Sequence, residues 1–125
     1  MAKRILVVED NDLNRKLFCD VLRASGFEVE PVADGELVMN AARAFAPDLV
    51  IMDIGLPDMD GYEVARGLRA DQGSSAVPLI ALTGYGQLRD KEAAAMAGFD
   101  AHLVKPVNPD DLVATIEGVL ARLTA

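Results

Sequence analysis

Reactive side chains stand at the ends of four short apolar runs of the chain: Glu9, Asp10, Asp53, Thr83 and Lys105. Three carboxylates in one cleft repel one another and raise each other's pKa unless a cation neutralises them. A single lysine leaves two of the three negative charges uncompensated, and a divalent cation matches that deficit. A few oxygen ligands with room for water favour Mg²⁺ over Zn²⁺ or a Ca²⁺ cage, with Mn²⁺ as an alternative ion.

Asp53 is the acid best suited to react with a phosphoryl group. Its carboxylate could act as a nucleophile and form an aspartyl phosphate, while Mg²⁺ and Lys105 offset charge on the phosphoryl oxygens. Thr83 could give the new dianion a hydroxyl hydrogen bond. Gly55 lets the backbone pass close to the site, so its carbonyl is a candidate metal ligand; the alternative is a plain turn glycine.

The apolar runs alternate with helical stretches, which predicts βαβ units and a parallel sheet. Continuous apolarity predicts strands covered on both faces for four runs: 5–8, 49–52, 79–82 and 103–104. A fifth segment, 27–32, alternates and contains Pro31, which indicates an edge strand. Because the carboxyl ends of parallel strands share one edge of the sheet, we expect the reactive side chains to converge there.

Five helices are expected between the strands. Helical periodicity and end signals place them at about 12–25, 35–45, from 60 onward, 87–97 and from 108 onward. The third opens with Asp60 as a cap and Glu63 reaching back to it, and the fifth opens with Asn108 and Pro109. Right-handed crossovers then require helices on both faces of one sheet, a (βα)5 arrangement.

Composition excludes several classes of protein. A chain of 125 residues with 51% hydrophobic and 26% charged residues is typical of one soluble globular domain. The net charge of −8 argues against direct nucleic-acid binding and against an anionic membrane surface. A single cysteine, Cys19, favours a reducing, cytoplasmic setting. No apolar run approaches the roughly 18 residues that a membrane span needs.

Four motifs, in this order and at this spacing, resemble the receiver domain of two-component response regulators. They are Val-Glu-Asp-Asn at 8–11, Met-Asp-Ile-Gly-Leu-Pro-Asp-Met-Asp-Gly at 52–61, Ala-Leu-Thr-Gly at 81–84 and Val-Lys-Pro at 104–106. The segment 8–18 is most similar to single-domain receivers of the DivK type, and it also resembles receivers appended to hybrid histidine kinases. The resemblance implies a flavodoxin-like (βα)5 three-layer sandwich with a parallel sheet of order 2-1-3-4-5.

The resemblance also implies a role for each acid. Asp53 would be the phosphoacceptor. Mg²⁺ would be held by Asp10, Asp53 and the Gly55 carbonyl, and by Glu9 partly through water. Other strand-end and loop acids are expected to be solvated or to cap helices: Asp12, Asp34, Asp48, Asp58 and Asp60.

The remaining implied roles concern the phosphoryl group and a switch. Thr83 and Lys105 would contact the phosphoryl group, and a cis peptide before Pro106 would aim the lysine. His102 stands where the family usually has Tyr or Phe, a ring that turns inward on activation. His102 could make the same movement and add pH sensitivity; the alternative is an ordinary surface residue of an edge strand.

The implied function is that of a phosphoacceptor signalling module. A histidine kinase or histidine phosphotransfer protein would phosphorylate Asp53. The surface of the fourth helix, fifth strand and fifth helix would then change for a downstream protein target. Leu13, Asn14 and Leu17 would offer a docking face to the phosphodonor histidine helix, with one of the two leucines expected in the core.

Other interpretations remain open. The chain ends just past its fifth helix, so we expect a single receiver domain over 1–125 without an output domain; the alternative is a receiver excised from a hybrid histidine kinase. A phosphorylation-independent protein-binding module is a second alternative. Beyond slow self-catalysed phosphorylation and dephosphorylation no enzyme activity is expected, because an aspartate-nucleophile phosphatase needs a second acid where Gly55 stands.

Overall fold

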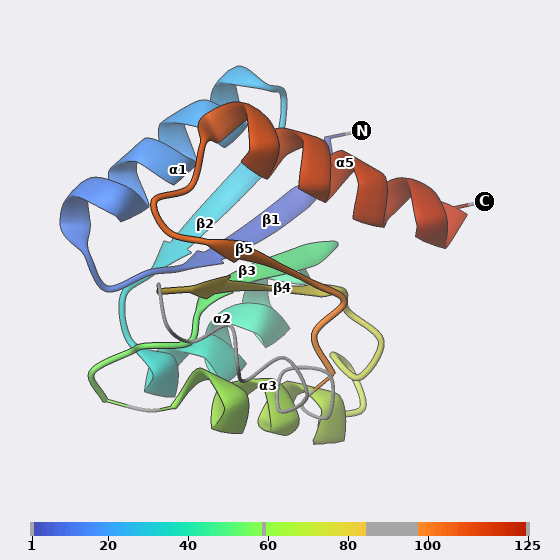
Figure 1. The fold of residues 1–125 in the computed structure, drawn as a ribbon. Helices are drawn as coiled ribbons and strands as arrows, with labels where there is room; N and C mark the ends of the chain where they lie inside the picture. The colour runs from blue at the N-terminus through green and yellow to red at the C-terminus, as the bar shows by residue number, and fades with distance from the viewer. Residues whose placement is uncertain (1, 59, 85–97, 125) are drawn as a thin grey trace.

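The computed structural model describes residues 2–58, 60–84 and 98–124 of the chain. Five parallel strands form one sheet of order β2-β1-β3-β4-β5 between two layers of helices (Figure 1). The predicted fold class, strand order and edge position of the proline-containing strand are therefore confirmed. The strands are β1 (Arg4–Val8), β2 (Glu28–Val32), β3 (Leu49–Asp53), β4 (Leu79–Thr83) and β5 (Ala101–Val104).

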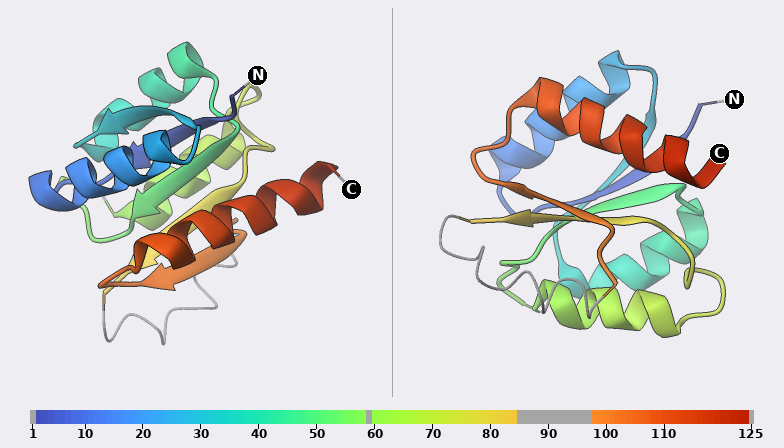
Figure 2. Two further views of the ribbon diagram at one scale, coloured as in Figure 1. Left: turned by 90° about the horizontal axis from the view of Figure 1, so that it is seen from above. Right: turned by 45° about the vertical axis from the view of Figure 1, so that its right-hand side comes forward.

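Helices cover both faces of this sheet. The described ones are α1 (Asp12–Ala24), η1 (Gly35–Leu37), α2 (Val38–Phe45), α3 (Gly61–Ala70) and α5 (Pro109–Thr124). Helices α1 and α5 pack on one face and α2 and α3 on the other (Figure 2). The segment 35–45, predicted as one helix, opens as a 3-10 turn, and the predicted helix 87–97 lies outside the described residues. No helix in the described ranges has the length and apolarity to cross a membrane.

The continuous apolar runs are explained by two cores, one on each side of the sheet. In β1, Ile5 and Val7 join the core under α1 and α5, whereas Leu6 and Val8 join the core under α2 and α3. Successive side chains of a strand point to opposite faces, so every residue of the runs 5–8, 49–52 and 79–82 is buried. The same prediction was wrong for 103–104, because β5 lies at the edge of the sheet and its residues are partly buried or exposed. Each fully buried aliphatic side chain contributes roughly 1.5–3 kcal/mol relative to exposure.

Two leucines of α1, Leu13 and Leu17, lie differently from the prediction. Phe18, Cys19 and Leu22 are buried against the sheet, but Leu13 is 80% exposed and Leu17 is 45% exposed. One of these two leucines was expected in the core, and neither is buried. The helix turns the stripe through Phe18 and Leu22 towards the sheet, which leaves the leucine pair on its outer side.

Two predicted helix starts are confirmed in their capping contacts. The Asp60 carboxylate accepts a hydrogen bond from the Tyr62 N–H at 2.9 Å and so caps α3. The Asn108 side chain accepts one from the Asp110 N–H at 2.8 Å at the start of α5. Both helices therefore begin at the carboxyl edge of the sheet, where the strand ends place the reactive side chains.

Candidate metal and phosphoryl site

Three carboxylates converge at the carboxyl edge of the central strands. Glu9 and Asp10 follow β1, and Asp53 is the last residue of the neighbouring strand β3. Each offers one oxygen such that the three oxygens lie within 4.8 Å of one another. Glu9 is fully buried and Asp53 is 7% exposed, while Asp10 is exposed to solvent. This cluster therefore has two desolvated acids and one that faces water.

Lys105 supplies the positive charge closest to the buried acids. Its Nζ lies 2.8 Å from Asp53 Oδ2 and 2.6 Å from Glu9 Oε1. The peptide between Lys105 and Pro106 is cis. One ammonium group thus bridges two carboxylates from β1 and β3, although it comes from the connection after β5.

The two buried acids have opposite pKa shifts. Burial raises the pKa of Glu9 to about 7, although its contact with Lys105 opposes the shift. Burial would also raise the pKa of Asp53, but hydrogen bonds from Lys105, Glu9 and the Gly55 backbone outweigh it and hold that pKa below its usual value. Burial lowers the pKa of Lys105, yet its two carboxylate partners outweigh this and raise it. Asp53 is therefore the acid of the pair that stays charged more readily.

The Asp53 carboxylate is fixed at both of its oxygens. Oδ1 accepts a hydrogen bond from the Gly55 N–H at 2.9 Å, and Oδ2 accepts one from Lys105 Nζ at 2.8 Å. The Gly55 backbone therefore lies beside the acid cluster, in the loop where its carbonyl was predicted as a ligand. A carboxylate held in this way needs little reorganisation before it reacts.

Thr83 and His102 lie on the two strands at the other side of the site. Thr83 is buried, and its Oγ1 donates a hydrogen bond of 3.4 Å to the Leu103 carbonyl of β5. His102 precedes that residue on the edge strand β5, opposite Ala81, and is exposed. The Thr83 hydroxyl is thus engaged with β5, next to the position predicted as a switch.

Arg15 is a site residue that the sequence analysis missed. Its guanidinium donates hydrogen bonds to the backbone carbonyls of Glu9, at 3.0 Å, and Asp10, at 3.3 Å. It also pairs with the Asp12 carboxylate at 2.5 Å. The spacing of Asp12 and Arg15, three residues apart on a helix, is a signal that could have revealed it. Arg15 ties the loop that carries two of the acids to the first turns of α1.

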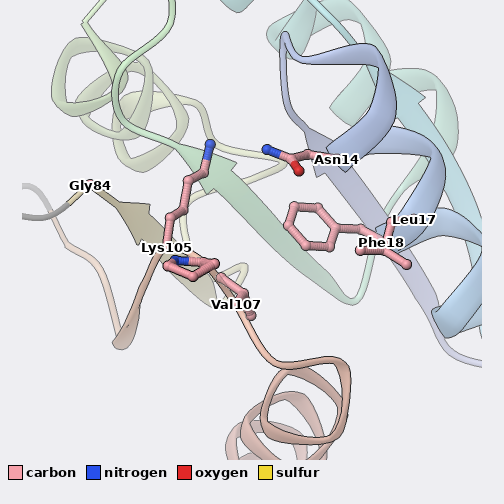
Figure 3. Close-up of a pocket in the computed structure, with 7 residues that line it drawn as sticks. Asn14, Leu17, Phe18, Gly84, Lys105 and Val107 are labelled. Atoms are coloured by element: carbon pink, nitrogen blue, oxygen red, sulfur yellow. The ribbon is translucent and has the colours of Figure 1, made fainter.

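An open groove of about 350 Å³ lies beside Lys105. Asn14 and Leu17 of α1 line it on one side, and Lys105, Pro106 and Val107 line it on the other (Figure 3). Lys105 therefore contacts the acids and also borders a surface that a partner can reach.

Comparison with known proteins assigns the chain and its fold to a class. The model of the response regulator receiver domain matches residues 5–117. The chain is 38% identical to the polar-differentiation response regulator DivK of Brucella ovis over 120 residues, covering 96% of this chain and 98% of DivK. The chain therefore belongs to the response regulator receiver domain family of two-component signalling.

Solved structures agree with this assignment. A crystal structure of a putative response regulator from Chloroflexus aurantiacus has a TM-score of 0.91 at 32% identity, covering 97% of this chain and 99% of that one. The receiver domain of the sensor histidine kinase PA1611 from Pseudomonas aeruginosa has a TM-score of 0.82 at 35% identity, with 98% and 97% covered. In that structure a magnesium ion is coordinated in the active-site cleft.

Proposed function

We propose that the chain is a phosphoacceptor module in which Asp53 receives a phosphoryl group from a phosphohistidine. The observation that carries this proposal is the Asp53 carboxylate itself, buried at the end of β3, held by Lys105 and Gly55 and flanked by two further acids. An Asp53 oxygen attacks phosphorus, the P–N bond to the donor imidazole breaks, and its electron pair returns to that imidazole. Water later attacks phosphorus, which restores the carboxylate and releases phosphate.

The residues present fit a divalent cation. Glu9 Oε1 is buried and, among the described residues, has no partner with hydrogen-bond geometry, although Lys105 Nζ approaches it closely. Glu9, Asp10, Asp53 and the Gly55 carbonyl would hold Mg²⁺, or Mn²⁺ in its place. The cation supplies positive charge that offsets the charge of the phosphoryl oxygens during transfer. Lys105 provides a second positive charge on the same side of Asp53.

Phosphorylation of Asp53 changes the edge of the sheet through Thr83 and His102. It adds about −1.5 to −2 charges and new acceptor oxygens beside β4. Thr83 turns its hydroxyl to these oxygens and gives up its long bond to the Leu103 carbonyl. His102, the exposed neighbour of Leu103, then repacks, and the surface of β5, α5 and the helix predicted at 87–97 changes for a downstream protein target.

The groove beside Lys105 is the proposed docking place for the phosphodonor. Asn14 and the exposed Leu17 line it, and Lys105, which contacts two of the acids, lines it as well. Leu13, also exposed, lies one turn earlier on α1. An apolar face of a helix that carries the phosphohistidine fits such a surface. The donor is a histidine kinase or a histidine phosphotransfer protein, and the chain acts as a single receiver domain.

Intact-mass analysis after incubation with acetyl phosphate and Mg²⁺ tests the proposal. We expect one phosphoryl adduct on the wild-type chain and none on the Asp53→Asn variant or in excess chelator. The matched control is Asp20→Asn, which removes an exposed acid of α1 and should label normally. A wild-type chain that never acquires the adduct, with Asp53→Asn binding its partners like the wild type, would favour the phosphorylation-independent alternative.

A further inference from the structure

The loop after β3 is fastened to the start of η1 by one side chain, that of Asp58. Its Oδ1 accepts a hydrogen bond from the Gly35 N–H at 3.0 Å, and its Oδ2 accepts one from the Glu36 N–H at 3.0 Å. Asp34 precedes η1 in the sequence and makes no capping hydrogen bond with its side chain. The first N–H groups of η1 are therefore capped from a loop more than twenty residues further along the chain.

The same loop is closed at its base by Gly61. The Gly61 N–H donates to the Ile54 carbonyl at 3.1 Å, and a Cβ on Gly61 would lie only 2.5 Å from Ile54 Cα. Leu56, a residue of the loop itself, is buried in the core under α2 and α3. Gly55, whose carbonyl is the proposed metal ligand, thus lies between this base and the attachment at Asp58.

We propose that Asp58 is a positioning residue for the divalent cation site, because it holds the loop that presents the Gly55 carbonyl. This inference rests on the proposed function. Both Asp58 oxygens accept hydrogen bonds from η1 amides. Among the described residues the cluster suited to a metal comprises Glu9, Asp10 and Asp53 alone. Asp58 therefore acts on the site through the loop backbone and not as a ligand.

The contact between Asp58 and η1 also means that metal binding at the site affects η1. If the Asp58 attachment strengthens metal binding, then metal binding must strengthen the attachment by the same factor. The Gly35 and Glu36 amides should accordingly exchange with solvent more slowly when Mg²⁺ is bound. A purely structural cap on η1 would protect these amides equally with and without the ion.

Isothermal titration with Mg²⁺ tests the proposal on the whole chain. Removal of Asp58 contacts in Asp58→Ala should raise the Kd by about tenfold, the lower end of the range for residues that orient metal ligands. Asp58→Asn keeps one acceptor oxygen and should show a smaller rise. Asp34→Ala removes the same charge from the same neighbourhood without breaking these bonds, so it should bind Mg²⁺ like the wild type.

Amide hydrogen exchange of the wild type, with and without Mg²⁺, supplies a readout that needs no variant to fold. Slower exchange at Gly35 and Glu36 on Mg²⁺ addition supports the proposal. Unchanged exchange there, or equal Kd values for Asp58→Ala and wild type, would overturn it while leaving the proposed function intact. A wild-type chain that binds no Mg²⁺ at all would overturn both.

Discussion

The Lys105 ammonium lies 2.8 Å from the Asp53 carboxylate, and the two residues belong to segments 52 positions apart. The same ammonium approaches Glu9 at 2.6 Å. Because both acids are almost fully buried, this one cation compensates charge that solvent cannot reach. In the metal-free protein the charge of Asp53, the proposed phosphoacceptor, and the stability of the fold therefore depend on the same side chain.

Replacing Lys105 by Gln should destabilise the metal-free protein. The variant leaves two buried acids without a cation, and loss of one partner of a buried pair typically costs on the order of 3–5 kcal/mol. Lys105 is 23% exposed, so solvent screens part of this interaction, and we expect a loss of about 2 kcal/mol, below that range. Urea denaturation at pH 7 measures it.

The control for this prediction is Lys16→Gln. Lys16 pairs with Asp20 at 2.5 Å on the surface of α1, with 75% and 55% of the side chains exposed. Such surface pairs contribute about 0–1 kcal/mol. Equal losses for the two variants would contradict the view that Lys105 compensates buried charge.

Mg²⁺ should stabilise the wild-type chain and replace part of what Lys105 supplies. A ligand at 100 times its Kd adds about 2.7 kcal/mol to the free energy of unfolding. Thermal unfolding should therefore shift upward with Mg²⁺ and return on addition of chelator. Asp10→Asn should abolish most of the shift, whereas Asp20→Asn should retain it. An undiminished shift in Asp10→Asn would remove Asp10 from the proposed ligand set.

The sequence predicts the sheet well because burial on both faces requires continuous apolar runs. Such runs mark β1, β3 and β4, and their ends locate Glu9, Asp53 and Thr83. The order of the strands came from resemblance to a family, since apolar periodicity alone does not order parallel strands.

The sequence pattern does not predict contacts between loops that are far apart in the chain. Asp58 was expected to be solvated or to cap a helix, but the pattern does not specify that it caps η1, which precedes it by more than twenty residues. The exposure of both Leu13 and Leu17 was likewise missed, because apolar spacing defines a stripe but not which edge of it the sheet covers.

The raised pKa of Glu9 predicts a fall in stability with pH. Burial brings this pKa to about 7 from its ordinary value of 4.5. The folded state thus holds a proton that the unfolded chain releases. The stability that comes from this proton is fully present below about pH 4.5 and is lost as pH rises through about 7. The loss in the free energy of unfolding is on the order of 1–3 kcal/mol. Denaturant titrations of the metal-free protein at pH 5 and pH 8 measure it.

Glu9→Gln isolates that effect. The variant carries no titrating group at this position, so it should match the wild type at pH 5 and exceed it in stability at pH 8. Glu117→Gln, an exposed change on α5, should follow the wild type at both values. The pKa of Asp53 is lowered, not raised. The stability that this carboxylate contributes is therefore lost only as pH falls through that lowered pKa, which lies outside the range from pH 5 to pH 8. A Glu9→Gln profile that parallels the wild type would show that another group carries the dependence.

Two glycine-to-alanine changes separate loop geometry from helix propensity. In Gly61→Ala the new Cβ would meet Ile54 Cα at 2.5 Å, so the base of the loop after β3 must shift. We expect a loss of roughly 1–3 kcal/mol in stability from this overpacking, together with weaker Mg²⁺ binding because Gly55 moves with the loop.

The control is Gly118→Ala, in the exposed interior of α5, where the new Cβ meets nothing within 4 Å. Its stability should rise by about 0.5–1 kcal/mol with Mg²⁺ affinity unchanged. Thermal unfolding and Mg²⁺ titration of both variants measure the contrast, and a Gly61→Ala protein that binds Mg²⁺ like the wild type would show that the loop backbone does not take part in the site.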